Sequence, residues 1–470
     1  MSRDSIPMDS SRSSWFVPLT LGLIPIAIVL LMIFSPIAIV VVVGIAICFC
    51  SAIENETALL LNIFLLPFAW VIRADLPLSN IVVPTRDLAV LAFFTGRVWR
   101  GNLRFKLFRR EPITIVSLIF FAVCVGTVIW GSTGWTHSSA RALTLITSYV
   151  LFYLFVVEWV DTEARMFKVV VTLLLSTLLV SLFGIFQEAV GGYTSLWLYL
   201  YPPDEAFIEW NNRVPSFLGY SNLLAGYLNL ILPFAVACGF KGNPNLRKLG
   251  WWTAVVGTIA LVFTQSRAGL VAFGCVLLMA ILQFVKKRSK QLVSFCLLSV
   301  GGPAVFIVGR VLSPEHLGSI VAREPMERLL FWATAWRMFR AAPLFGIGIG
   351  NYGEIYGQYI PAYLIPPRHF TANGLYFQII SEMGLVGLFS FLGLAGVAIF
   401  VARRQLKWSQ ASLTQSLGFG ILAGIVATLV HGLVDLALDV SPQWGTLFWF
   451  MLGLLAASTR LRQVRALPEN

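Results

Sequence analysis

Residues 24–34 read IPIAIVLLMIF, a stretch without a single polar side chain. Strands of a transmembrane β-barrel alternate polar and apolar residues, so an unbroken apolar run predicts a helix. Similar runs recur from one end of the chain to the other. Since a helix needs about 20 apolar residues to cross a bilayer, the sequence predicts an all-α, polytopic integral membrane protein.

The composition excludes a water-soluble enzyme. The chain has 470 residues, of which 58% are hydrophobic and 12% are charged. Soluble domains have about 45–50% apolar and about 25% charged residues. The same figures exclude a disordered chain, a collagen and a disulfide scaffold. The six cysteines all fall in apolar runs, without the spacing of metal ligands, and are interpreted as small core residues.

Apolar runs predict 12 to 14 transmembrane helices, the spread coming from two or three runs near the N-terminus. The run at 15–34 is too long for a signal-peptide core and is taken as the first span. The expected positions are 15–34, 36–52, 57–73, 80–96, 113–130, 142–160, 168–189, 217–238, 250–265, 268–285, 291–311, 376–402, 415–432 and 445–460.

The distribution of basic residues predicts the orientation. The chain has 34 Lys+Arg against 22 Asp+Glu, a net charge of +12, which in a soluble protein could indicate nucleic acid binding. Here the basic residues crowd short loops that the positive-inside rule assigns to the cytoplasm, and the parity of the spans agrees. Both termini are then cytoplasmic, and no nucleic acid partner is expected. The basic segments are 97–110, 241–248, 286–290, 403–407 and 460–465.

Four regions follow from this topology. Residues 1–14 form a cytoplasmic tail, and 15–311 hold transmembrane helices with a smaller outer loop near 190–216. Residues 312–375 form a large periplasmic loop with helical segments, and 376–470 hold the last helices and a cytoplasmic tail. The large loop contains five arginines and no lysine. Guanidinium groups hold phosphate oxygens through two parallel bonds, so a diphosphate or carboxylate ligand is one interpretation, and pairing with nearby glutamates is the other.

Two arginines outside the large loop are likewise interpreted either as ligand contacts or as structural residues. Arg267, in FTQSRAGL (263–270), lies between two apolar runs at their predicted outer ends. It either extends toward the membrane interface or clamps a ligand phosphate. Arg213 is a similar candidate. The following Tyr220, Ser221 and Asn222 could bond sugar hydroxyls or cap a helix.

Residues 327–339 are predicted to be helical, with Arg328 and Arg337 more than two turns apart and Arg340 just beyond. Pro343 ends this helix, and a glycine-rich run follows at 343–352. The spacing of its glycines does not match a dinucleotide fingerprint, so a close-packed turn is predicted there.

Histidines supply the candidates for a catalytic base. A neutral imidazole at His369, beside Arg368, could accept a proton from an attacking hydroxyl. His431 and Asp435 are spaced for a carboxylate–imidazole contact, either functional or an ordinary buried pair. The sequence shows neither a metal-ligand spacing nor a Ser-His-Asp order.

The chain resembles the O-antigen ligase/polymerase superfamily of bacterial membrane proteins. The resemblance covers roughly the C-terminal half and rests on the order of five segments, while the first 200 residues match only in being apolar. The segments are FLGYSNLLAGYL (217–228), FTQSRAGL (263–270), ERLLFWATAWRMFRAAPLFGIGIGNY (327–352), NGLYFQIISEMGLVGL (373–388) and HGLVDL (431–436).

The resemblance implies a glycosyltransferase of the bacterial inner membrane. Such enzymes pass a glycan from undecaprenyl pyrophosphate to an acceptor hydroxyl, on a lipid A core of lipopolysaccharide or on another lipid-linked glycan. Neither a metal ion nor a nucleotide sugar is required. Arg267 and Arg328 match family arginines that would bind the diphosphate, and Asn373 matches the asparagine of a His-Asn pair.

The histidine of that pair is replaced here by Ala372, and the nearest histidine is His369. An alanine at this place also occurs in a cyanobacterial branch once proposed to move bicarbonate. A small-anion transporter is therefore the alternative function, although no internal repeat typical of transporters is visible. A scaffold subunit of an envelope-polysaccharide complex is the third interpretation.

Overall fold

The computed structural model describes residues 55–68, 73–75, 82–84, 111–190, 213–284, 323–360, 371–408, 412–435 and 442–466. The chain divides into two compact units. The first unit comprises Met1–Asn62 and Ile72–Leu103. It holds the start of α3 (Asn55–Leu65) and a short antiparallel pair, β1 (Arg73–Asp75) and β2 (Val82–Pro84), in which Arg73 lies opposite Pro84.

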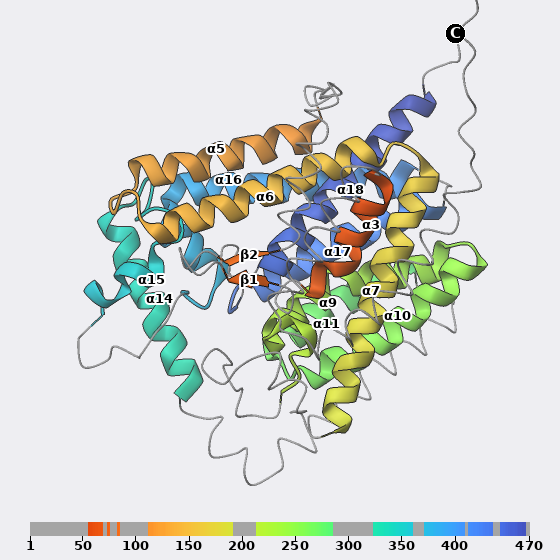
Figure 1. Ribbon diagram of the computed structural model, residues 1–470, viewed down its shortest axis with the longest axis horizontal. Helices are drawn as coiled ribbons and strands as arrows, with labels where there is room; N and C mark the ends of the chain where they lie inside the picture. Colours follow the sequence, from red (N-terminus) through yellow and green to blue (C-terminus); the bar gives the residue numbers. More distant parts are fainter. Residues whose placement is uncertain are drawn as a thin grey trace, which may run out of the picture. The chain divides into compact units, whose positions relative to one another are not determined.

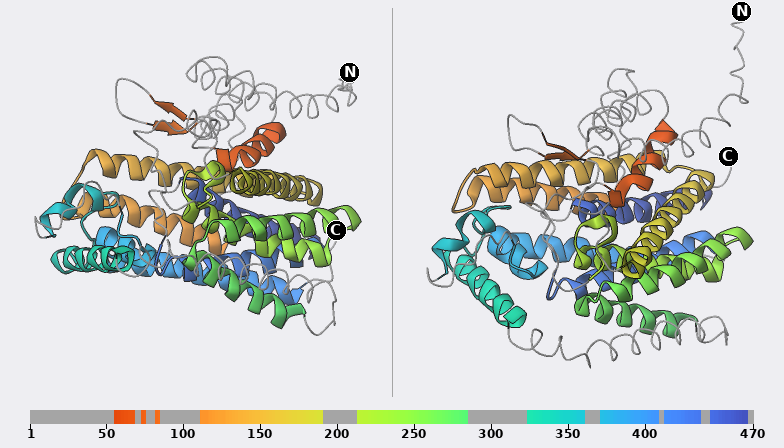
Figure 2. Two further views of the ribbon diagram at one scale, coloured as in Figure 1. Left: turned by 90° about the horizontal axis from the view of Figure 1, so that it is seen from below. Right: turned by 60° about the horizontal axis from the view of Figure 1, so that its bottom comes forward.

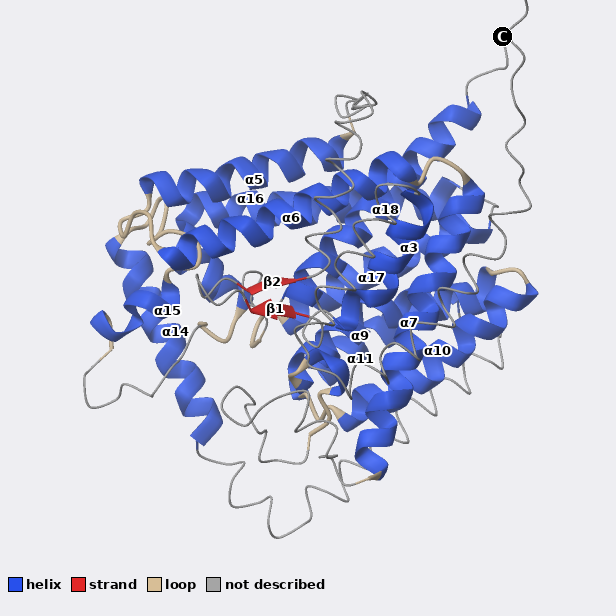
Figure 3. Cartoon of the chain, in the orientation of Figure 1, coloured by secondary structure: helices blue, strands red, loops and turns tan. Residues whose placement is uncertain are grey.

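The second unit, Ile63–Val71 with Arg104–Asn470, is built from helices, which Figure 3 draws in blue. Its elements, in chain order, are η1 (Leu66–Phe68), α5 (Pro112–Trp130), α6 (His137–Trp159), α7 (Glu163–Ala189), η3 (Ser216–Leu218), α9 (Ser221–Lys241), α10 (Pro244–Phe263), α11 (Arg267–Phe284), α14 (Arg323–Ala341), α15 (Tyr352–Ile355), η5 (Tyr356–Gln358), α16 (Leu375–Trp408), α17 (Ser412–His431) and α18 (Pro442–Ala466).

These bounds confirm the predicted all-α, polytopic fold. Within the described ranges, six helices are long and apolar enough to cross a membrane, and α11 and α17 are shorter apolar helices. The six helices are α5, α6, α7, α9, α10 and α16. The predicted spans at 15–34, 36–52 and 291–311 lie outside the described residues.

Two N-terminal predictions differ from the structure. The span expected at 57–73 is shorter, because α3 ends at Leu65, two residues before Pro67, and residue 73 already belongs to β1. The span expected at 80–96 begins on a strand, since β2 occupies Val82–Pro84. Its two adjacent β-branched valines favour extended backbone, and the following proline cannot donate a helical hydrogen bond.

Local signals start several helices where the sequence places them. Thr136 caps α6 by accepting a hydrogen bond from the backbone of Ser139, whose side chain accepts one from Thr136 in return. Asn243 caps α10, and Pro244 occupies its first turn, where a missing amide hydrogen costs nothing. Polar residues thus begin α10 before its apolar stretch.

Helix α9 lies at the centre of the second unit. It packs against α10 and α17, and α17 also contacts α11 and α16 (Figures 1 and 2). In the most apolar stretch of α9, 94% is buried inside the protein, whereas only 39% of the corresponding stretch of α16 is buried. The exposed side chains of α16 include Phe389, Leu392 and Phe400. A helix with an apolar exposed side suits contact with lipid, so α16 lies at the periphery and α9 in the interior.

Hydrogen bonds bring two of the basic segments, 403–407 and 460–465, to one end of this bundle, here named the basic end. The Arg460 guanidinium donates to the carbonyl of Val160 at 3.0 Å, which joins the C-terminal parts of α6 and α18. The Gln405 amide donates to Ser458 at 2.6 Å, which adds the end of α16. The first turns of α6 and α16 and the last turn of α17 therefore lie at the opposite end of the bundle.

The glycine-rich run forms the predicted close-packed turn. Gly346, Gly348 and Gly350 all have positive φ angles, which only glycine adopts without strain. A Cβ atom at Gly346 would lie 2.3 Å from the carbonyl carbon of Glu382. The amide of Gly348 donates to the Glu382 carbonyl at 2.9 Å, beside a kink in α16 at Gly384. The turn thus holds α14 and α16 together.

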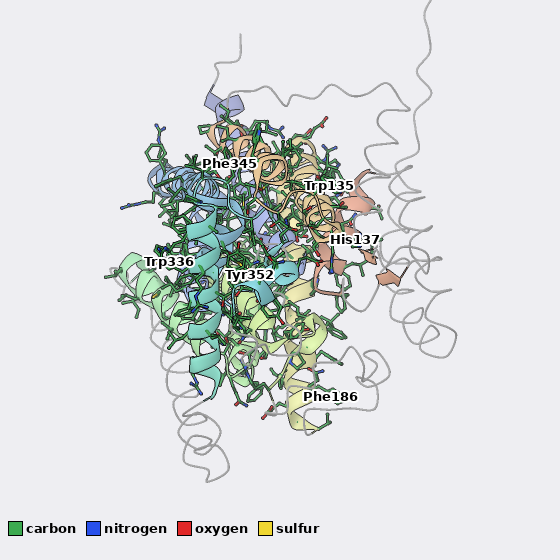
Figure 4. All side chains as sticks on the ribbon, turned by 90° about the vertical axis from the view of Figure 1, so that its left-hand side faces the viewer. Trp135, His137, Phe186, Trp336, Phe345 and Tyr352 are labelled. Atoms are coloured by element: carbon green, nitrogen blue, oxygen red, sulfur yellow. The ribbon has the colours of Figure 1, made fainter. Side chains whose placement is uncertain are left out.

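The α5–α6 turn is joined to the same region. Thr136 donates to the side-chain oxygen of Asn351, and the Asn351 amide donates to the carbonyl of Ile347 at 3.0 Å. Figure 4 looks onto this end of the bundle, with Tyr352 and the outward-facing Trp336 labelled. Burial raises the pKa of the Tyr352 hydroxyl, which therefore stays neutral. This hydroxyl donates to the carbonyl of Phe331 at 3.0 Å and thereby holds α14 in place.

Candidate functional site

Asp435 joins two arginine-bearing segments at the opposite end of the bundle. The Arg328 guanidinium of α14 lies 3.7 Å from the Asp435 carboxylate and also donates to the neighbouring carbonyl of Val434. The Asn222 side-chain amide, in the first turn of α9, donates to the same carboxylate oxygen. The side chains of Arg328 and Asp435 are 29% and 18% exposed, so solvent and ligands reach this contact.

Arg213 extends the network toward α10 and α11. Its Nη2 donates to the side-chain oxygen of Asn222 at 2.6 Å, and its Nε donates to the carbonyl of Thr264 at 3.0 Å. Thr264 ends α10, and Arg267 begins α11 three residues later. Arg213 therefore ties the α10–α11 turn to the Asp435 contact.

Arg267 is exposed at the start of α11. Helix α11 is held against α9, because the Asn229 amide donates to the carbonyl of Gly269 at 2.9 Å and a Cβ atom at Gly269 would lie 2.7 Å from Ala225. The backbone that carries Arg267 is thus fixed, while its guanidinium faces solvent. We name Arg213, Asn222, Arg267, Arg328 and Asp435 the arginine cluster.

The turn before α16 lies beside the arginine cluster. Asn373 has a positive φ of 50°, and its side chain accepts a hydrogen bond from Thr371 at 3.0 Å. Its carbonyl accepts one from the indole of Trp332, one turn along α14 from Arg328, at 3.2 Å. The amide of Leu375 donates to the carbonyl of Gly432 at 2.8 Å, close in sequence to Asp435. The turn that contains Asn373 therefore contacts both α14, one helical turn from Arg328, and the segment that leads to Asp435.

His431 is fully buried at the end of α17. Neither of its ring nitrogens bonds to a residue that the structure describes. The carboxylate–imidazole hydrogen bond that the spacing suggested is therefore not formed. The Asp435 side chain instead turns toward Asn222 and Arg328, because these polar partners lie where the helix ends.

Arg337 and Arg340 do not join the arginine cluster. Arg337 lies nine residues beyond Arg328 on α14, a distance of about 13 Å along the helix axis. It is exposed and donates to the carbonyl of Tyr359 at 2.7 Å, and Arg340 is exposed in the last turn. His369 lies outside the described residues.

Sequence reasoning missed the role of Asn222. It offered this residue as a helix cap or as a partner of sugar hydroxyls, but the cap position of α9 is Tyr220 and carries no side-chain bond. The partners of Asn222 are Arg213, nine residues before it, and Asp435, which is 213 residues after it. No local spacing encodes the second contact, which only the packing of α9 against α17 brings about.

The arrangement is suited to an anionic ligand. Three arginines and one carboxylate leave two positive charges in the cluster, and the guanidinium groups stay charged in partly buried surroundings. Among the described residues, no group of three His, Cys, Asp or Glu side chains is placed to hold a metal ion.

Residues 252–392 match the family model described as O-antigen ligase. The matched range includes Arg267, Arg328 and Asn373, and it confirms the resemblance to the O-antigen ligase superfamily. A comparison with curated proteins finds no match. All five segments that carry the resemblance reach the cluster or its border, from Asn222 in the first to Asp435 in the last.

Proposed function

We propose that this multi-pass membrane protein, with its O-antigen ligase segment, passes a glycan from a polyprenyl diphosphate to an acceptor hydroxyl at the periplasmic face. The observation that carries the proposal is the bonded network of Arg213, Asn222, Asp435 and Arg328. It joins arginines from distant segments at the bundle end opposite the basic end. By the positive-inside rule we propose that the basic end faces the cytoplasm and the arginine cluster the periplasm, in a protein of the bacterial inner membrane.

In the proposed reaction, the acceptor oxygen bonds to the anomeric carbon of the donor sugar as the bond from that carbon to the phosphate oxygen breaks. The polyprenyl diphosphate leaves with the bonding electrons. Arg328, Arg267 and Arg213 stabilise the charge that develops on this leaving group. The acceptor proton goes to a base, for which His369 is the candidate. Asn373, beside Arg328, is proposed to bond the glycan.

Arg337 and Arg340 are proposed to bind the donor or acceptor farther from the diphosphate. Both are exposed on α14, near the exposed apolar side chains of Leu329 and Trp336. A helix face that combines arginines with apolar residues suits a boundary between lipid and water. The acceptor is then a lipid A core or another lipid-linked glycan that lies in the same leaflet.

The proposal is tested with purified protein in proteoliposomes supplied with a polyprenyl-diphosphate oligosaccharide and a glycolipid acceptor. We expect glycan-extended acceptor, with a single addition for a ligase and a ladder for a polymerase. Retention of all glycan on the carrier, across several acceptors, would contradict the proposal.

Arg267→Lys should reduce transfer about tenfold or more in this assay. Lysine keeps the charge but cannot form two parallel bonds to a phosphate. The matched control is Arg165→Lys, because Arg165 forms an exposed ion pair with Asp161 at 2.7 Å, outside the cluster. We expect wild-type transfer from that control. Equal transfer by the two variants would show that Arg267 supplies no more than charge.

A further inference from the structure

We infer that Asn222 is a positioning residue for the diphosphate, acting through Arg213 and Asp435 rather than by touching the reacting atoms. The inference rests on the proposed function and gives Asn222 a role different from the helix cap or sugar contact that the sequence suggested. It starts from the side-chain amide of Asn222, which uses both its donor and its acceptor in the arginine cluster.

The amide of Asn222 links a cation to an anion. Its oxygen accepts from Arg213 at 2.6 Å, and its nitrogen donates to Asp435. Each bond fixes the orientation of the other, because an amide rotated by 180° would present its nitrogen to the guanidinium and its oxygen to the carboxylate. The amide side chain of Asn222 thus satisfies the cation and the anion at the same time.

Asp435 places the second arginine relative to the first. The carboxylate oxygen that accepts from Asn222 also lies 3.7 Å from Arg328. Two guanidinium groups repel one another, and a carboxylate between them reduces that repulsion. The chain of contacts therefore holds Arg213 and Arg328 near one another before a ligand arrives, which lowers the entropy lost on binding.

Asn222 has the local support that a positioning residue needs. It lies in the first turn of α9, and the side chain of the preceding Ser221 and the two leucines that follow are buried. Arg213 is held independently by the carbonyl of Thr264 at 3.0 Å. Loss of the Asn222 amide should thus remove one hydrogen bond from Nη2 of Arg213 without removing the side chain from the site.

The test measures binding of inorganic pyrophosphate to the detergent-solubilised full chain by calorimetry. We expect Asn222→Leu to raise the dissociation constant about tenfold, because the leucine is similar in size but can neither accept nor donate. Asn222→Gln, which keeps both functions, should recover part of the affinity. Asn243→Leu is the matched control, since the side chain of Asn243 accepts a hydrogen bond from the backbone amide of Leu246 and caps α10, outside the arginine cluster. Its pyrophosphate affinity should equal that of wild type.

A double-mutant cycle separates positioning from general support of the fold. If Asn222 acts through Arg213, then Asn222→Leu should change the dissociation constant less than twofold in an Arg213→Ala background. An equal loss in both backgrounds would overturn the inference, as would wild-type affinity in Asn222→Leu or no pyrophosphate binding by the wild type. Glycan transfer is measured on the same preparations. Transfer by the wild type with an unaltered Asn222→Leu variant defeats the inference alone, and Asn222-dependent binding without any transfer defeats the proposed function alone.

Discussion

Arg328→Ala should lower glycan transfer roughly 100-fold or more while the protein accumulates and purifies as the wild type does. Removing one preorganised group that stabilises the charge developing in the transition state typically lowers the rate about 100-fold to 1000-fold. Arg328 is well placed for the role, because Asp435 orients it and α14 is fixed through Tyr352 and the glycine-rich turn. The loss should appear in the transfer rate as well as in the donor affinity, since charge develops as the bond breaks.

The measurement is the initial rate of acceptor glycosylation in proteoliposomes at matched protein content. Arg165→Ala serves as control, because it removes an arginine at the start of α7 whose contacts, with Asp161 and Trp159, lie outside the cluster. Transfer by Arg328→Ala within a few-fold of that control would exclude Arg328 from the diphosphate site.

Gly346→Ala should have the largest effect on stability. The added Cβ atom would lie 2.3 Å from the carbonyl carbon and 2.4 Å from the carbonyl oxygen of Glu382, and backbone atoms cannot move aside as a flexible side chain can. The positive φ of 69° adds strain for any residue but glycine. The clash and the backbone strain together should lower the free energy of unfolding by about 4 kcal/mol or more, which is exceptional for a single substitution.

Gly134→Ala is the control that isolates the clash. Gly134 has a φ of 73°, but within the described part of the chain no atom beyond its two chain neighbours lies within 4 Å of the position that an added Cβ atom would occupy, so only the conformational cost of about 1–2 kcal/mol applies there. We expect Gly346→Ala to abolish recovery of monodisperse protein, or to lower its melting temperature far more than Gly134→Ala does. Similar melting temperatures for the two variants would mean that the turn is less tightly packed than described.

Apolar runs predicted the transmembrane helices well because burial in lipid leaves few other choices for the backbone. The run at 113–130 became α5 (Pro112–Trp130) almost residue for residue. The predicted end of a helix came too early where polar residues continue the helix beyond its apolar run. Helix α16 extends to Trp408 although its apolar run ends near residue 402. The kink at Gly384 was also missed, because it is imposed by the turn at 343–350 packed against it.

The sequence supplied the charged residues of the candidate site and not the contacts between them. The absence of lysine from residues 312–375 directed attention to arginine, and Arg328 of that segment shares one network with Arg213. Their link through Asn222 and Asp435 spans more than 200 residues, so no spacing rule could reveal it. The pairing of His431 with Asp435 stays a prediction, although the His431 ring nitrogens form no hydrogen bond within the described residues.

The central claim is that the arginine cluster serves glycosyl transfer from a lipid diphosphate. Its most direct test is the stoichiometry of products from wild-type protein in proteoliposomes, with free polyprenyl diphosphate and glycosylated acceptor measured together. We expect one polyprenyl diphosphate to be released for each glycan added to the acceptor. Bicarbonate flux across the same vesicles, without release of polyprenyl diphosphate from any donor, would exclude glycosyl transfer and establish an anion transporter instead.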